Sequence, residues 1–462
     1  MCIRDSNKAD KSGSGLVAAS WAGAMSIITE SLNGTDPDRV GVIGGSRLTN
    51  ESQYAWAKLA KGVIGTDHVS ADLGDELPPH VLLGLPRATI SEICSPGNTV
   101  VLLTPDLKEE YGTLFIRLRD AAKNLGVNII ELSPVKTALS SDAVASLHPL
   151  PGEIGNVVEA LVTGNIPREV GGISGEEISQ AHTYLKDTNV FVVVSRSSMG
   201  QSEVPIIEAL TSFQELENCR FLPLVRRANT MGALDMGMAP GLLPGRNTLS
   251  SGSSAFSDIW TNLPAETGAN TKQILQKASD GEIDVLFLLG ADPLTDFPNK
   301  ALAEAALQKV ETLVAVDLFV TPSVYESDVV LPATSFLEAD GSHTNVEGRI
   351  TPIRQKITPP GTARPDWMIA LDLVSYLSPN LGPTTFKELC EEISSVSEIH
   401  KDLDLTKAEK IDNEGVVLIS APKQVKITSI KIPKQKTNTF RLVATRRMYD
   451  EGVLTSHSSA LK

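Results

Sequence analysis

The residues of this chain that could do chemistry follow short apolar runs. Gly44, Gly45 and Ser46 come after the run 40–43 and before a helical pattern over about 51–62. Backbone N–H groups in such a turn could approach a phosphate at the helix N-terminus. The spacing is not G-x-G-x-x-G, and a tight strand-to-helix turn with a Ser or Thr cap is the favoured alternative.

A second glycine turn follows the apolar run 285–289. It contains Gly290 and Asp292, and Pro293 comes directly after it. In a parallel sheet this is the carboxyl end of a strand, where ligands bind in open α/β folds. The equally favoured alternative is a strand terminator, since a residue before proline is held extended.

Acidic side chains gather around the next two apolar runs. Asp317 closes the run 312–316, and Asp328 comes directly before the run 329–331. Carboxylates at such positions could chelate a metal or orient a sugar hydroxyl. Surface turns also favour Asp for backbone reasons, and this second interpretation is preferred.

The other residue types with catalytic potential are scattered. The cysteines form no C-x-x-C pair, no two histidines have metal-ligand spacing, and there is no G-x-S-x-G motif. The residues alone therefore predict neither a metal-ligand set nor a catalytic nucleophile. The cysteines lie at Cys2, Cys94, Cys219 and Cys390.

The apolar runs alternate with helical patterns, which predicts parallel sheets covered on both faces. We expect an α/β protein with tandem doubly wound, Rossmann-like units over 38–165 and 166–380. Residues 229–271 are dense in Gly, Pro, Ser and Asn and predict a long loop. The remaining segments are expected to be a disordered or truncated start (1–37), a linker with short β-segments (381–436) and the truncated beginning of a β-barrel domain (437–462).

Composition limits the partners of the chain. The 41 Lys and Arg against 56 Asp and Glu give a net charge of −15, which disfavours nucleic acid and anionic lipid. No run approaches the roughly 18 apolar residues of a membrane span. Cysteines spread far apart suit a reducing cytoplasm. We expect a soluble, intracellular protein that does not insert into a membrane.

Several strings resemble the molybdopterin oxidoreductase family in order and spacing over about residues 38–378. These strings include 46–51 (SRLTNE), 290–293 (GADP), 328–333 (DVVLPA) and 345–349 (NVEGR). Within the family, residues 73–78 (LGDELP) and 227–237 (RANTMGALDMG) are similar to the largest peripheral-arm subunit of bacterial NADH-quinone oxidoreductases (complex I).

The resemblance implies where a pterin nucleotide would bind in active relatives. Its contacts would fall on two sets of residues, regarded here as vestigial: Gly44, Ser46 and Asn50, and Gly290, Asp292, Asp317 and Asp328. Active relatives carry a Cys or selenocysteine ligand to molybdenum in the segment that corresponds to 67–80, which contains no cysteine. Serine or aspartate ligands in some relatives keep three residues open as alternatives: Ser70, Asp72 and Asp75.

The function that the resemblance implies is a metal-free, non-catalytic scaffold within this large subunit of complex I. No cofactor is expected in this chain, since the family's iron–sulfur region would precede it. Its expected partners are other peripheral-arm subunits, at the cytoplasmic face of the membrane. One alternative is an active molybdopterin-dependent enzyme of formate dehydrogenase type, and another is a nucleotide-binding protein without metal or complex.

Overall fold

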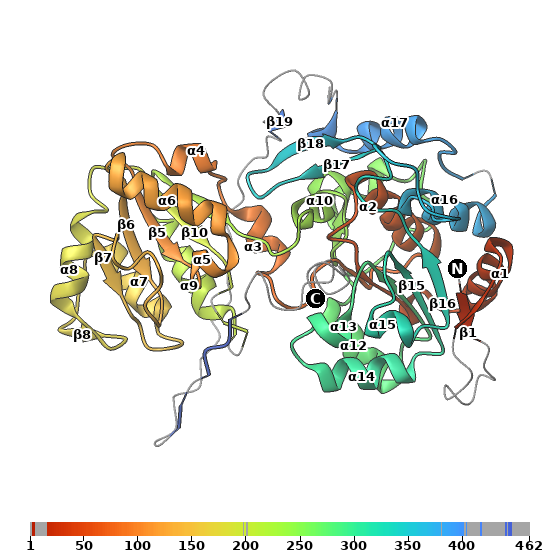
Figure 1. Cartoon of the computed structure of the whole chain (residues 1–462), viewed down its shortest axis with the longest axis horizontal. Coiled ribbons are helices and arrows are strands. Elements are labelled where there is room, and N and C mark those ends of the chain that lie inside the picture. Colours follow the sequence, from red (N-terminus) through yellow and green to blue (C-terminus); the bar gives the residue numbers. More distant parts are fainter. Residues whose placement is uncertain are drawn as a thin grey trace. The chain divides into compact units, whose positions relative to one another are not determined.

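The computed structural model describes residues 2–4, 16–196, 198–199, 202–379, 381–401, 403, 416–417, 439–440 and 442–445. The chain divides into two compact units. Unit 1 contains residues 1–75 and 226–420, and unit 2 contains residues 76–225 and 421–462. Each unit is built around its own sheet (Figure 1).

Unit 1 has a seven-stranded sheet in the order β2-β1-β16-β15-β14-β3-β4. Five strands are parallel, and β1 and β2 are antiparallel at one edge. The strands, in that order, are β2 (Leu16–Ala18), β1 (Cys2–Arg4), β16 (Val329–Pro332), β15 (Thr312–Asp317), β14 (Val285–Leu289), β3 (Val40–Gly44) and β4 (Val69–Ser70).

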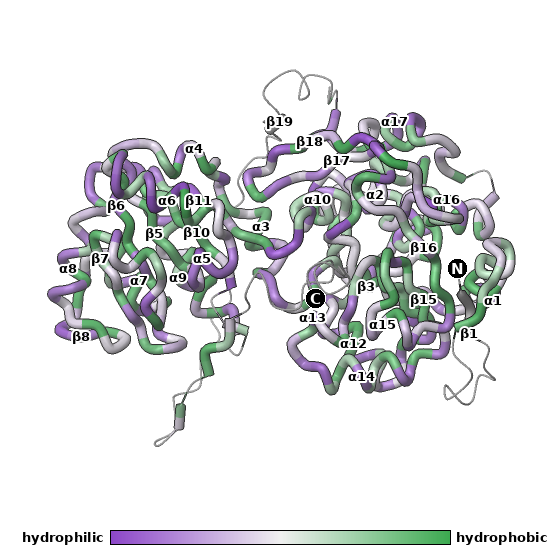
Figure 2. The backbone as a smooth tube through the Cα atoms, in the orientation of Figure 1, coloured by the Kyte–Doolittle hydropathy of each residue, from purple (hydrophilic) through white to green (hydrophobic). Residues whose placement is uncertain are grey.

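Helices cover both faces of this sheet, which explains why its central strands are apolar throughout. Phe287 and Leu289 belong to a core cluster with side chains of α1, α2 and α16. Leu286 and Leu288 belong to another, with side chains of α12 and α14. Figure 2 shows the hydrophobic strands inside. The helices are α1 (Trp21–Leu32), α2 (Asn50–Ala57), α12 (Thr271–Asp280), α14 (Lys300–Lys309) and α16 (Asp366–Leu377).

Shorter elements connect these parts of unit 1. A π-helical turn, η2 (Lys58–Ile64), extends α2, and 3-10 turns lie at η1 (Pro37–Arg39), η3 (Pro244–Arg246), η4 (Ser253–Ala255) and η5 (Glu398–His400). The short helices are α10 (Thr230–Asp235), α11 (Leu249–Gly252), α13 (Pro293–Asp296) and α15 (Pro322–Tyr325), and a longer helix, α17 (Phe386–Val396), follows α16. Small ladders are formed by β12 (Leu242–Leu243), β13 (Asn247–Thr248), β17 (Gly341–Thr344), β18 (Arg349–Ile353) and β19 (Val416–Val417).

Unit 2 has a five-stranded parallel sheet in the order β11-β10-β5-β6-β7. Its strands are β5 (Thr99–Leu103), β6 (Asn128–Leu132), β7 (Ala145–Leu147), β10 (Val190–Val194) and β11 (Cys219–Pro223), with a small ladder of β8 (Glu169–Val170) and β9 (Ile173–Ser174). Its helices are α3 (Pro79–Gly84), α4 (Ile90–Ile93), α5 (Leu107–Glu110), α6 (Gly112–Asn124), α7 (Ile154–Thr163), α8 (Gly175–Thr183) and α9 (Val204–Phe213).

Two α/β units with parallel sheets confirm the expected fold class. The structure nevertheless divides the chain differently from the expected tandem units 38–165 and 166–380. Strand β3 pairs with β14, so the sheet of unit 1 is interrupted in sequence by the whole of β5 to β11. Apolar runs reveal strands but not which sheet they join, and neighbouring strands in sequence usually pair.

Packed helices lie in three segments for which the sequence predicted none: the disordered or truncated start, the long loop, and the linker with short β-segments. Within 1–37, α1 is a 12-residue helix whose Ala24 and Ile28 are fully buried. Within 381–436, α17 forms an amphipathic helix with Leu389 in the core. Within 229–271, α10 is buried throughout. Burial against neighbouring elements, which is α2 for both α10 and α17, supplies the stability that local propensity does not.

The expected start of a β-barrel domain, 437–462, lies mostly outside the described residues. Among the helices that the structure describes, none has the length and apolar character needed to cross a bilayer.

Candidate functional site

The candidate site lies at the carboxyl edge of the sheet in unit 1, where β3, β14 and β15 end together. Gly45 N–H donates to Leu289 C=O (2.8 Å), and Gly290 N–H donates to Val316 C=O (2.9 Å). These bonds hold the turn around Gly44 beside the turn around Gly290, and Asp317, at the end of β15, lies on the other side of the Gly290 turn. Residues more than 270 positions apart in sequence thus meet at one edge.

Asp328 does not join this group. Its carboxylate accepts the N–H of Leu313 (2.8 Å), the second residue of β15, and its own N–H donates to Leu313 C=O (2.8 Å). Asp328 therefore lies at the amino edge of the sheet, opposite the other positions. The prediction that grouped Asp328 with the other positions was wrong. Asp328 precedes its strand, whereas residues at the carboxyl edge end a strand or follow it.

The Gly44 turn is shaped by strand packing. Gly44 has φ +104°, and a Cβ there would lie 2.4 Å from Leu289 O and 2.7 Å from Ala291 Cβ. Only glycine fits such a contact with positive φ. The close approach is to β14 rather than to open space, which favours the tight-turn interpretation. Ser46 is buried, and its C=O accepts the N–H of Asn229 (3.0 Å).

Asn50 lies in a buried amide network that the sequence did not predict. Its Nδ2 donates to the hydroxyls of Ser342 and Thr344 (both 3.1 Å), and its Oδ1 accepts from Asn229 Nδ2 (2.9 Å). Asn229 Oδ1 in turn accepts the N–H of Thr344 (2.7 Å). The polar atoms of Asn50 are therefore engaged within the protein. The sequence carries no usable signal for this network, because Asn229 simply follows Arg227 and Ala228 and belongs to no motif with a recognisable spacing.

The N-terminus of α2 is covered as well. Glu51 accepts the N–H and the hydroxyl of Ser342 (both 2.8 Å), which fixes β17 over the first turn of the helix. A Cβ on Gly341 would lie 2.4 Å from Thr49 Cγ2. Because β17 packs so closely on this turn, a phosphate has no access to the N–H groups that an open helix N-terminus would offer. Burial raises the pKa of Glu51.

Asp292 is likewise committed to internal bonds. It is 3% exposed and accepts both the N–H (3.1 Å) and the hydroxyl of Ser323, the second residue of α15. Gly290 has φ +53° with no close neighbour apart from Leu48 Cδ1 at 3.7 Å, so its turn needs glycine for backbone geometry. Asp292 thus ties α13 to α15, as a structural turn residue would.

A chain of arginines and carboxylates borders the edge. Arg227 forms a buried bidentate pair with Asp75, with Nη–Oδ distances of 2.7 and 3.1 Å. Arg227 also lies 3.7 Å from Asp296, which Arg47 approaches to 3.4 Å while donating to Gly290 C=O (2.8 Å). Sequence analysis proposed Asp75 only as a metal ligand, and missed its pairing because its partner is 152 residues away.

Two carboxyl groups at this edge have pKa values raised toward neutrality. Burial raises the pKa of Asp317 to about 6, and the nearby Asp292 contributes while Arg47 opposes. Burial, with the charge of Asp317, raises the pKa of Asp366 to about 7. Asp366 begins α16, so the pair links the end of β15 to that helix. Groups of this kind can exchange protons near pH 7.

We expect these raised pKa values to appear as a pH-dependent stability. A carboxyl whose pKa is higher in the folded state favours folding at low pH, and loses that contribution as pH rises from about 4 to 7. Replacing Asp366 by Asn should therefore flatten the fall in unfolding free energy between pH 5 and 7.5, by about 2 kcal/mol. Urea titrations at both pH values measure this, with the exposed Asp258→Asn as control. An unchanged slope in Asp366→Asn would contradict the assignment.

The donor groups in 67–80 do not fit a metal. Both oxygens of Asp75 are taken by Arg227, and Asp67 is held by Lys61 (2.7 Å) and the N–H groups of Gly241 and Gly268 (2.6 and 2.7 Å). Among the residues that the structure describes, no three His, Cys, Asp or Glu side chains converge. The remaining alternatives are also placed: Asp72 Oδ1 accepts Gly74 N–H (2.9 Å), and Ser70 is buried on β4.

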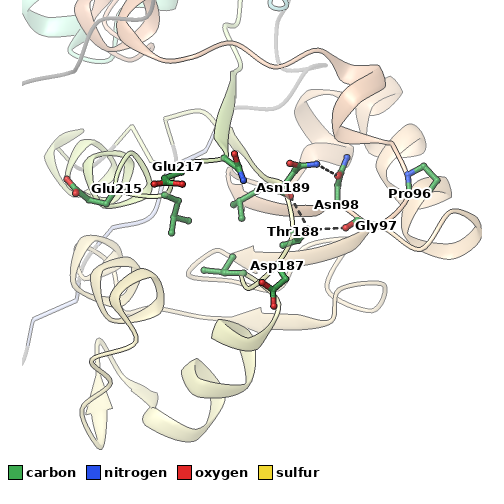
Figure 3. Close-up of a pocket in the computed structure, with 12 residues that line it drawn as sticks. Pro96, Gly97, Asn98, Asp187, Thr188, Asn189, Glu215 and Glu217 are labelled. Carbon is green, nitrogen blue, oxygen red and sulfur yellow. Dashed lines mark hydrogen bonds between the residues drawn. The ribbon is translucent and has the colours of Figure 1, made fainter.

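Unit 2 contains a separate depression of about 590 Å³ at the amino ends of β5, β10 and β11. Figure 3 shows that amide groups and exposed carboxylates line this depression. The side-chain amide of Asn189 donates to Asn98 Oδ1 (3.3 Å). It lies at the sheet edge where ligands of open α/β folds do not usually bind. The acidic residues that line it are Asp187, Glu215 and Glu217.

The amino-acid sequence is similar to those of known oxidoreductase subunits. An NADH-quinone oxidoreductase subunit from Rhizobium meliloti (strain 1021) is 27% identical over 96% of this chain and 56% of its own length. The alpha subunit of F420-dependent formate dehydrogenase from Methanocaldococcus jannaschii is 26% identical over 79% of this chain and 61% of its own length. The chain thus spans little more than half the length of these curated relatives.

Solved structures show the same fold. Acetylene hydratase from Pelobacter acetylenicus matches with a TM-score of 0.64 over 91% of this chain and 68% of that chain, at 14% identity. The sequence profile of the molybdopterin oxidoreductase family matches residues 3–376. Because that match covers most of the 462 residues, the chain belongs to the molybdopterin oxidoreductase family.

Proposed function

We propose that this chain is part of the large peripheral-arm subunit of an NADH-quinone oxidoreductase, where it serves as a metal-free scaffold. In this role it performs no catalysis itself and supports electron transfer from NADH to quinone. Iron–sulfur clusters would be carried by another part of the subunit. Its partners would be the other peripheral-arm subunits, at the cytoplasmic face of the membrane.

One observation carries the proposal: polar groups at the positions where the resemblance implies a pterin contact (Asn50, Asp292) or leaves a metal ligand open (Asp75) are engaged inside the protein. Asp75 pairs with Arg227, Asn50 bonds to Asn229, and Asp292 bonds to Ser323. A working cofactor site would keep such donors and acceptors directed at its ligand. The similarity to the NADH-quinone oxidoreductase relative over 96% of this chain supports the same assignment.

An exposed apolar surface in unit 1 also supports a scaffold. Leu337 C=O accepts the N–H groups of Lys356 and Ile357 (2.8 and 3.1 Å), and Leu337, Ile357 and Phe336 are 41–56% exposed. Large apolar side chains exposed together mark surfaces that contact other proteins. Two more exposed side chains follow β15, whose last residue bonds to Ala333: Leu318 (43%) and Val320 (60%).

The proposal is tested on the full-length protein purified with its partners. We expect elemental analysis to find iron but no molybdenum or tungsten, and no pterin fluorescence after oxidation, in a preparation that reduces quinone with NADH. Stoichiometric molybdenum or tungsten with pterin would overturn the scaffold and make 67–80 the place to search for the ligand.

A second candidate is an active molybdopterin-dependent oxidoreductase of formate dehydrogenase type. The similarity to the formate dehydrogenase relative favours it. It requires a protein ligand to the metal without a cysteine in 67–80, and there Ser70 offers only a hydroxyl that is 3% exposed. The same elemental analysis separates the two candidates.

A further inference from the structure

The chain contains one Asn-Gly pair, Asn33-Gly34, and it lies where α1 ends (Figure 1). Asn33 is the C-cap of α1, and its N–H donates to Thr29 C=O (3.0 Å). Gly34 has φ +78°, and a Cβ placed on it would meet no described atom within 4 Å. Both residues are exposed, so solvent reaches the pair on the outside of unit 1.

An exposed Asn-Gly pair can react with itself. The backbone nitrogen of Gly34 attacks the side-chain carbonyl carbon of Asn33, the new N–Cγ bond closes a cyclic imide, and the Cγ–Nδ2 bond breaks. The amide proton of Gly34 leaves with Nδ2 as ammonia. Water then opens the imide at one of its two carbonyl groups, which leaves either aspartate or isoaspartate. Glycine favours the attack because it has no side chain beside the nitrogen.

The reacting groups are free, but the turn that carries them is anchored. In the part of the chain that the structure describes, neither the Asn33 side chain nor the Gly34 N–H makes a hydrogen bond. Asn33 has ψ 115°, which turns the Gly34 nitrogen away from Cγ, so the peptide between the two residues must rotate before the ring can close. Thr35 opposes this rotation, because its N–H donates to Leu32 C=O (3.2 Å) and its hydroxyl to Ser31 C=O (2.7 Å). We call these two bonds the Thr35 clasp.

We propose that Asn33 is a site of spontaneous deamidation in the folded chain, and that the Thr35 clasp limits its rate. The product places a carboxylate at the C-terminal end of α1, where the helix macrodipole is already negative. Asp36 and Asp38 follow closely in sequence, so the new charge joins like charges. An isoaspartate also lengthens the backbone at this point, since the chain then runs through Cβ. The modification therefore loosens the end of α1, and it does not depend on the function proposed above.

The test is peptide mapping by mass spectrometry of the full chain, kept folded in mildly alkaline buffer, with aspartate and isoaspartate peptides separated by chromatography. We expect both products to accumulate at Asn33. Asn165 is the internal control, since it is also exposed but is followed by Ile166, whose branched side chain shields the nitrogen. Thr35→Val removes the hydroxyl bond at similar volume, and we expect it to speed the conversion of Asn33 about fivefold, the equivalent of one lost hydrogen bond.

Two further variants separate the clasp from a general loosening of the fold. Thr35→Ser keeps the hydroxyl and should convert at the rate of the unmodified chain. Thr163→Val removes the same kind of bond, from a Thr hydroxyl to Glu159 C=O (2.7 Å), at the end of α7, and should leave the rate at Asn33 unchanged. If the folded chain stays unmodified while the urea-unfolded chain converts, or if Asn165 converts as fast as Asn33, the assignment of the site is wrong. A Thr35→Val rate equal to that of the unmodified chain would rule out the clasp.

Discussion

Replacing Arg227 by Met is expected to lower the unfolding free energy by about 3–5 kcal/mol, because it leaves the Asp75 carboxylate buried without its bidentate partner. The two side chains are 3% and 1% exposed, so solvent cannot replace the lost bonds. Arg226 lies 3.7 Å from Asp75, which is too far for it to replace the pair. Urea unfolding followed by circular dichroism measures the change.

The double variant Arg227→Met with Asp75→Leu separates the cost of an orphaned charge from the worth of the pair. We expect it to recover most of the lost stability, since a buried ion pair replaced by apolar residues of similar volume is often neutral. Arg226→Met is the matched control, because Arg226 is 31% exposed and approaches the same carboxylate only to 3.7 Å, so we expect a smaller loss of stability. A single Arg227 variant as stable as this control would contradict the proposed role of the pair.

The same pair shows why the sequence predicted the fold better than the site. An apolar run of five or six residues, such as 285–289, is a local signal, and its burial on both faces followed from the pattern. A carboxylate carries no local signal of what it faces. The sequence around Asp75 would look the same whether its carboxylate bound a metal or an arginine. Its partner is known only from the fold, which brings Arg227 next to it.

Some positions at the sheet edge could be predicted from the sequence and others could not. Gly44 and Asp317 end their strands and Gly290 directly follows one, so the rule that carboxyl ends of parallel strands meet placed them together. Asp328 precedes its strand, and the same rule applied to its direction would have excluded it. The interruption of unit 1 by unit 2 had no signal of this kind, because pairing of β3 with β14 depends on contacts across more than 240 residues.

Replacing Asn229 by Ala is expected to cost about 3 kcal/mol or more, since it leaves several buried groups without partners at about 1–3 kcal/mol each. Its Nδ2 donates to Leu48 C=O (2.7 Å) and to Asn50 Oδ1 (2.9 Å), and its Oδ1 accepts Thr344 N–H (2.7 Å). Asn229 is fully buried, so water does not reach these groups. Chemical denaturation measures the loss, with the exposed Asn156→Ala as control.

Asn229→Asp separates hydrogen bonding from volume. The substitution keeps the shape but turns the donating amide into an acceptor that faces Leu48 C=O and Asn50 Oδ1, so we expect it to be at least as destabilising as alanine. A well-tolerated aspartate would mean that packing, rather than the network, holds 46–53, 229–232 and β17 together. If both variants unfold unit 1, the network around Asn50, where the resemblance implies a pterin contact, stabilises the fold itself, which is the property that a scaffold requires and a ligand site does not.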